Sequence, residues 1–382
     1  MTCLVPTMDC LGRSTWEQRQ MKYLLGSLKK VPPQEQRLYD LSCEYIYKKH
    51  DRKHRQEVSD KCSSSACNTG LACQDVSLDV SDSTTSSSAT EQPGKLFVLE
   101  ASKQASVPQT VNMWRAAMDI GFNLSKMKKR KVMYILPLEE FPPFIYEFTF
   151  QGEKGFFVFL QKFAQAFFSG YDVRLMPGMN IHEAGWKVTS RIHKKTGQSQ
   201  LLVKDLYKYL KKRIPKDAYC ILGITWTDLY PSDEWNFVLG EATSAHRSGV
   251  FSFGRFEPKL YKDDFVPPPI ESIDAKLIWR MMKALSHETC HIYGMDHCVF
   301  FQCLMNESSS LEEALHQPVD LCPVCLRKLQ VVCGFNMLER YQGLLHFLQA
   351  VAKEFPCQHI HKACDWLTRT IAFIFEEESS QL

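Results

Sequence analysis

The hydrophobic pattern divides the 382-residue chain into three unequal parts. The first 61 residues contain two charged helical stretches separated by a pair of prolines. Residues 62–94 are rich in serine and poor in apolar side chains, a composition typical of a disordered linker or a long loop. We therefore expect a helical N-terminal extension over residues 1–61, a linker over residues 62–94 and one large domain over residues 95–382.

Beyond residue 95, short apolar runs alternate with segments in which apolar residues recur every three or four positions. The short runs predict strands, and the amphipathic segments predict helices. This alternation favours βαβ units in an α/β or α+β fold. The expected strands cover residues 96–99, 132–136, 173–176, 219–225 and 249–253, and the expected helices cover residues 155–168 and 201–212.

Another helical stripe begins near Ile273 and runs into a histidine-rich segment. We expect this helix to end an upper subdomain over residues 95–294. A mainly helical lower subdomain then covers residues 295–382, with helices at 336–354 and 365–376. The stretch at residues 236–240 reads either as an edge strand that pairs with a peptide or as an ordinary strand or loop.

Composition narrows the class of protein. Hydrophobic residues make up 45% and charged residues 23%, as in an ordinary globular domain, and the net charge of +3 favours no polyanionic partner. We therefore expect no nucleic-acid partner, no membrane span and a monomer. The start of the chain lacks the features of a signal peptide, and 15 cysteines suit a reducing compartment, so we expect the cytoplasm, with the nucleus as the alternative.

Three histidines and a glutamate stand in the order H-E-x-x-H-x-x-G-x-x-H. On a helix, His287 and His291 share one face, while Glu288 lies about 100° around the axis. Gly294 lets the chain leave the helix sharply, so that His297 can return as a third ligand. This arrangement predicts a catalytic zinc whose bound water is activated by Glu288. The alternative is a helix whose histidines serve only packing or solvent contact.

Four cysteines follow directly in the pattern C-x4-C-x18-C-x2-C. Cys298, Cys303, Cys322 and Cys325 form two close pairs separated by a loop, as in a tetrahedral structural zinc site. Buried free cysteines are the alternative. The expected cofactor is therefore two zinc ions per chain. Histidines 359 and 361, near two more cysteines, leave a third metal site open beside an ordinary helix or loop.

Together these residues resemble the archaemetzincins, a family of metzincin zinc peptidases. The resemblance covers roughly residues 95–340 and rests on the histidine motif, the four cysteines, Met305, Ser308 and the segments 235–242 and 249–256. It implies a metzincin-like fold, in which a mixed twisted sheet and its helices lie above the zinc helix and a four-cysteine zinc loop lies in the helical lower part. It also implies that Met305 supports the zinc ligands from below, and that the activity is aminopeptidase-like.

Two departures from the family pattern bear on function. Glu307 stands where a glycine is expected, and residues 315–317 replace an acidic and basic stretch. We predict a zinc metallopeptidase that acts on peptide or protein substrates. The alternative, which the departures support, is a zinc-stabilised binding or adaptor protein with little or no proteolysis. A nucleic-acid-binding zinc module is disfavoured because basic residues do not gather around the cysteines.

Overall fold

The computed structural model describes residues 22–36, 38–39, 97, 108–122, 125, 128–194, 196–254, 256, 271–308 and 311–375. The linker predicted over residues 62–94 lies outside them, as do most of the two N-terminal helical stretches and of the strand predicted at 96–99. The expected domain boundaries therefore stay predictions.

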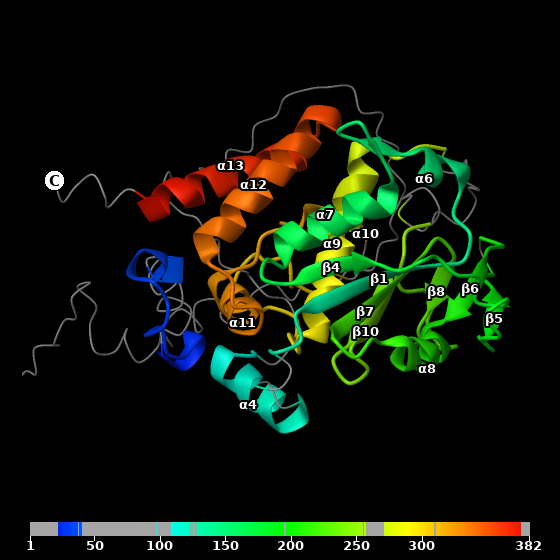
Figure 1. Cartoon of the computed structure of the whole chain (residues 1–382), viewed down its shortest axis with the longest axis horizontal. Coiled ribbons are helices and arrows are strands. Elements are labelled where there is room, and N and C mark those ends of the chain that lie inside the picture. Colours follow the sequence, from blue (N-terminus) through cyan, green and yellow to red (C-terminus); the bar gives the residue numbers. More distant parts are fainter. Residues whose placement is uncertain are drawn as a thin grey trace, which may run out of the picture.

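A five-stranded sheet organises the fold, in the order β4-β1-β7-β10-β9 (Figure 1). Four strands are parallel, and β9 at the edge is antiparallel to β10. The predicted strands at 132–136, 173–176, 219–225 and 249–253 are confirmed within a residue or two. The strands are β1 (Val132–Leu138), β4 (Asp172–Leu175), β7 (Ala218–Thr225), β9 (Gly240–Thr243) and β10 (Ser248–Ser252).

Helices cover both faces of this sheet, and alternate strand residues separate the two cores. Cys220, Leu222 and Ile224 of β7 join the core that contains α7 (Phe156–Phe167) and α9 (Ala275–Ile292). Ile221 joins the smaller core beneath α8 (Val203–Arg213). The fold is therefore mixed α/β, as predicted.

One boundary on the upper part was predicted wrongly, and one alternative that the sequence left open is decided. The helix expected from residue 201 begins at Val203, because the two preceding leucines belong to strand β6 (Ser199–Leu202). Residues 236–239 form no strand and make a single bridge, Leu229 to Val238, so the edge strand starts only at Gly240. The smaller elements here are α6 (Pro143–Glu147), β2 (Thr149–Phe150), β3 (Glu153–Lys154), β5 (Ser190–Ile192) and β8 (Asp228–Tyr230).

The rest of the described chain is helical. The helix predicted at 336–354 is confirmed as α12 (Met337–Glu354), which Asn336 caps by accepting from the Glu339 N–H. It packs beside α13 (Gln358–Phe375), which starts seven residues earlier than predicted (Figure 1). The other helices are α4 (Val111–Phe122), α10 (Leu311–His316) and α11 (Pro323–Cys333). Among the described helices, none combines the length and apolar character that a membrane crossing requires.

Candidate metal centre

Helix α9 carries the histidine motif, and both of its ends are defined by side chains or glycine. Its N-terminus is capped by Asp274, whose side chain accepts from the Leu277 N–H at 2.7 Å. At the other end Tyr293 is the last cap residue, and Gly294 has a φ of 73°, the left-handed region that favours glycine. The chain turns there as the sequence predicted.

The turn brings His297 back to the two helical histidines. Nitrogen atoms of His287, His291 and His297 lie within 4.8 Å of one another, and the Nε2 atoms of His287 and His291 are 3.1 Å apart. All three side chains are partly exposed. Three converging imidazoles that remain open to solvent fit a zinc with one free coordination position.

Backbone carbonyls fix the orientation of two of these rings. His287 Nδ1 lies 2.7 Å from the Leu304 carbonyl, and His291 Nδ1 lies 2.6 Å from the Met295 carbonyl. Because a carbonyl only accepts, each Nδ1 carries the proton and each Nε2 presents a lone pair to the cluster. The donor set is therefore prepared for a cation.

Burial keeps the imidazoles neutral. It lowers the pKa of His287 well below its usual range, and the neighbouring His291 adds to the effect. Burial and His297 lower the pKa of His291 to about 4. The pKa of His297 is also lowered by burial, although the carboxylate of Glu307 opposes this. Neutral imidazole is the form that binds a metal.

Glu288 lies beside the histidines and below the edge strand. Desolvation raises the pKa of its carboxyl group to about 8, and the negative charge of Glu241 on β9 adds to this. A Cβ atom at Gly240 would meet Glu288 Cγ at 3.2 Å and a Phe251 ring carbon at 2.8 Å. The glycine therefore lets the edge strand approach the carboxylate closely.

The four cysteines form a second, closed cluster. All four are buried, and their sulfur atoms lie within 4.8 Å of one another. Cys298 Sγ and Cys322 Sγ are 3.5 Å apart, too far for a disulfide. Hydrogen bonds from the other three thiols lower the pKa of Cys298 well below its usual range. Four converging sulfurs without an opening fit a structural zinc.

Met305 belongs to the loop that connects the two clusters. It is fully buried, its N–H donates to Cys303 Sγ at 3.4 Å, and its carbonyl accepts from the Cys298 N–H. The preceding carbonyl, that of Leu304, holds His287. The loop is therefore bonded to both clusters, and the support predicted for the Met305 side chain stays a prediction.

Sequence reasoning missed Asn306, which is neither a metal ligand nor part of either motif. Its side chain accepts from the Cys303 N–H at 2.7 Å and donates to the carbonyls of Cys298 and Phe301 at 2.8 and 2.9 Å. Its position between the cysteine pairs, next to Met305, was the available signal.

The two departures from the family pattern, Glu307 and residues 315–317, are in contact with each other. The Gln317 amide donates to the carbonyls of Asn306 at 2.9 Å and Glu307 at 3.3 Å. Lys283 of α9 in turn donates to the carbonyls of Leu315 and Gln317. Residues 315–317 are therefore hydrogen-bonded both to α9 and to the loop that contains Met305.

The described residues form no third metal group besides these two. His359 and His361 lie two positions apart on α13, so their side chains diverge. The His359 ring instead stacks on Trp279, with centroids 5.8 Å apart. These two histidines thus lie on an ordinary helix, the alternative that the sequence left open beside a third metal site.

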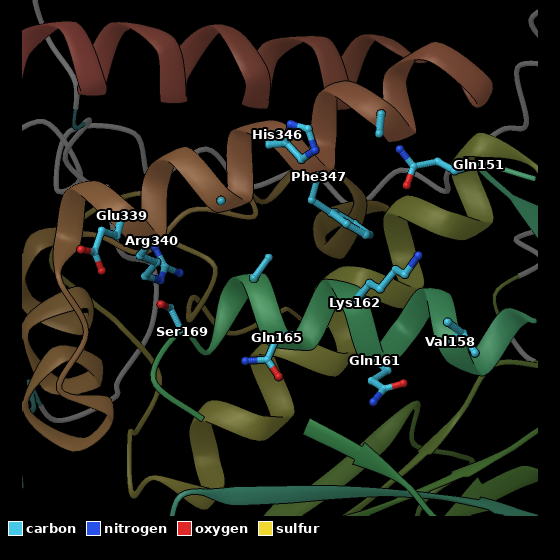
Figure 2. A pocket seen from close by; sticks show the side chains of 13 residues that line it. Gln151, Val158, Gln161, Lys162, Gln165, Ser169, Glu339, Arg340, His346 and Phe347 are labelled. Atoms are coloured by element: carbon cyan, nitrogen blue, oxygen red, sulfur yellow. The ribbon is translucent and has the colours of Figure 1, made fainter. Parts of the chain in front are cut away.

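A groove of about 630 Å³ between α7 and α12 is separate from the metal centre (Figure 2). No histidine or cysteine of the two clusters lines it. Gln161 and Gln165, which do, bond the backbone of Val173 at 2.6 and 2.9 Å and so join α7 to β4. These amides serve the packing of the upper layer.

Comparison with known proteins agrees with this geometry. Peptidase family M54 matches residues 171–331, which include both clusters. The resemblance to the archaemetzincins is confirmed. Archaemetzincin-2 of Pongo abelii is 35% identical over 224 residues, 53% of this chain and 61% of that protein. Human archaemetzincin-1 is 35% identical over 222 residues, 53% of this chain and 44% of that protein.

The chain thus covers 61% of the Pongo abelii protein and 44% of the human protein, less than two thirds of either. Among solved structures, archaemetzincin from Methanopyrus kandleri is 22% identical, with a TM-score of 0.37 over 53% of this chain and 94% of that one. A zinc-dependent peptidase from Methanocorpusculum labreanum is 19% identical, with a TM-score of 0.36 over 52% of this chain and 99% of that one.

Proposed function

We propose that this chain is a zinc-dependent peptidase whose metal is held by His287, His291 and His297. The observation that carries the proposal is the open cluster of three imidazoles, two of them oriented through Nδ1, with the Glu288 carboxylate alongside. Similarity to Peptidase family M54 and to the archaemetzincins supports it. A second zinc, held by the four cysteines, would stabilise the loop that supports His287.

Zinc, when bound, supplies Lewis acidity that polarises a peptide carbonyl and acidifies water. The chain's own contribution is a proton transfer by Glu288. Its carboxylate takes a proton from the attacking water as the new C–O bond forms, and delivers it to the amine nitrogen as the C–N bond breaks. A desolvated carboxyl group with a raised pKa suits a residue that must both take and give a proton near neutral pH.

Strand β9 supplies a place for the substrate backbone. Ser252 N–H donates to the Leu239 carbonyl at 2.8 Å, which sets the alternation of the β9–β10 ladder. The N–H and C=O groups of Gly240 and Ala242 consequently point away from β10, toward an edge that no described strand occupies. An extended peptide that pairs there would pass beside Glu288 and would be bound without strong sequence preference.

We propose aminopeptidase-like action as the mode of cleavage, on the support of the archaemetzincin resemblance. Two series of peptides, with free and with acetylated N-termini, test it. Preferential cleavage of the free series is expected, and equal cleavage of both series would instead assign internal cleavage.

Substitution Glu288→Gln tests the reaction itself. It preserves size and removes the base, so we expect kcat/KM on a peptide library to fall by about 10²- to 10⁴-fold. Zinc content should stay at two ions per chain, because Glu288 is not a ligand. Undiminished peptidase activity at full zinc occupancy would refute the assigned base. A wild-type chain that cuts no peptide while holding both ions would favour the binding or adaptor alternative.

We further propose a reducing location, the cytoplasm or the nucleus. Its support is that all nine cysteines within the described residues are free thiols, eight of them buried. Imaging of the full-length chain in cells tests it.

A monomer is proposed as the working state, and sedimentation equilibrium of the zinc-loaded chain tests that.

A further inference from the structure

The turn that brings His297 back, residues 293–296, is hydrogen-bonded to a segment about 180 residues earlier in the chain. This segment, residues 109–118, lies before the stretch that matches Peptidase family M54. It includes most of α4, which packs beside α11 below the end of α9 (Figure 1). Nothing in the histidine or cysteine motifs points to it.

Gln109 bonds the turn at two of its residues. Its amide donates to the Gly294 carbonyl at 3.1 Å and to the Asp296 carboxylate at 2.7 Å, and it accepts from the Asp296 N–H at 3.1 Å. The backbone groups on either side of Met295 are thereby paired. Met295 itself presents the carbonyl that orients His291.

Trp114 completes the contact from the same segment. It is fully buried, and its indole N–H donates to the Tyr293 carbonyl at 2.8 Å. Met118 closes the space above Gly294, since a Cβ atom there would fall 2.4 Å from Met118 Sδ. The turn has little room to adopt another path.

Gln109 also reaches the helix that begins at the second cysteine pair. Lys328 of α11 donates to the Gln109 side-chain oxygen at 2.7 Å. One amide is therefore bonded both to the histidine turn and to the helix that carries Cys325. Gln109, which belongs to neither metal cluster, therefore adds a connection between them to the one that the chain itself makes.

We propose that Gln109 and Trp114 are positioning residues that preset His297 and His291 for the catalytic metal. This inference rests on the proposed function, because it assigns the histidine cluster to zinc. Outer groups that orient metal ligands typically change metal affinity by about 10- to 100-fold when they are removed. Gln109 and Trp114 act one step further out, on the backbone that carries the ligands.

The test measures zinc retained per full-length chain against increasing chelator. Gln109→Ala and Trp114→Phe, which keeps an aromatic ring and removes the N–H, should each release one of two zincs at about 10-fold lower chelator concentration. The other zinc should be released as in the wild type. For peptide cleavage, kcat should fall with KM nearly unchanged, since the substrate edge is intact.

Asn112→Ala is the matched control on the same helix. Asn112 donates to the carbonyls of Lys22 and Tyr23, and within the described part of the chain its side chain forms no hydrogen bond with the turn. Its zinc release should equal that of the wild type. Two zincs held as tightly in Gln109→Ala and Trp114→Phe as in the wild type would overturn this inference alone. Simultaneous loss of both ions would also overturn it, because a general structural role is then indicated. A wild-type chain whose histidine cluster binds no zinc would overturn the proposed function as well.

Discussion

The amide of Asn306 makes three hydrogen bonds inside one short loop, and all three partners are backbone groups. It is 8% exposed, so water does not replace these bonds readily. Substitution Asn306→Asp keeps the shape but replaces the donating NH2 group by a carboxylate oxygen that faces two carbonyls. An unpaired buried polar group costs about 1–3 kcal/mol, more when it is charged. We expect the free energy of unfolding to fall by at least that much, with loss of the four-cysteine zinc.

Metal analysis and urea unfolding of the full-length variant measure this effect. Asn180→Asp is the control, since Asn180 accepts from the N–H groups of His182 and Glu183 in an exposed turn and a carboxylate can do the same. Full zinc retention in Asn306→Asp would show that the loop does not need the amide.

At this scale the sequence predicts ligands but not their supports. The histidines and cysteines are found because metal ligands lie close together in the chain at fixed spacings. Gln109 and Trp114 bond backbone carbonyls that lie 185 and 179 residues later in the chain. Such a bond requires only one donor side chain at the right place in space, and it leaves no periodic or spacing signal.

Among the elements, α8 and the residue that precedes β5 are joined by one buried carboxylate. Asp205 accepts from the N–H and hydroxyl of Thr189 at 2.9 and 2.6 Å, and from Lys208 at 2.6 Å. The bond from Lys208, with the Thr189 bonds, lowers the pKa of Asp205 from 3.8 to about 2. The anionic form is therefore favoured by folding.

The pH dependence follows from the sign of that shift. A lowered carboxyl pKa stabilises the fold fully above about pH 4, and this contribution disappears as the pH falls through about 2. Because Lys208 is largely exposed, we expect roughly 1–2 kcal/mol at pH 7. Asp205→Asn should lower the free energy of unfolding by this amount at pH 7 and by clearly less at pH 2.5. Urea unfolding at both values checks it, and a pH-independent difference would contradict the assignment.

Element prediction succeeded where one side of an element is polar and failed where burial is uniform. Helix α7 showed its stripe clearly and was predicted within a residue. Helix α11 was missed because ten of its eleven residues are buried, Arg327, Lys328 and Gln330 among them, so its polar positions mark no exposed face. The sequence left residues 236–240 open between an edge strand and a loop, because Gly240 and Ala242 of β9 are too small to mark a strand pattern.

Across the whole molecule, the described part of the N-terminal extension belongs to the main core. Leu24, Leu25, Val31 and Leu38 are at most 3% exposed and join the same apolar cluster as α7, α9 and α11. Buried Glu35 accepts from the Met337 N–H at 2.8 Å, which ties this segment to α12. The sequence suggested a separate helical extension because nothing in a local pattern reports where an amphipathic helix docks.

Because the N-terminal segment shares the main core, a destabilising substitution in it should lower the thermal stability of the domain as a whole. Leu38→Ala removes a side chain with no exposed surface, which costs about 2–5 kcal/mol when the site cannot collapse. We expect a single cooperative thermal transition at lower temperature, with far-UV circular dichroism and zinc release changing together, because the metal loops share this core. Tyr23→Ala in the same segment is the control: its side chain is 58% exposed, so the change should stay within about 0.5 kcal/mol. Should Leu38→Ala instead produce an early, separate transition while zinc is retained up to the wild-type temperature, the extension would be an independent unit that merely rests on the peptidase fold.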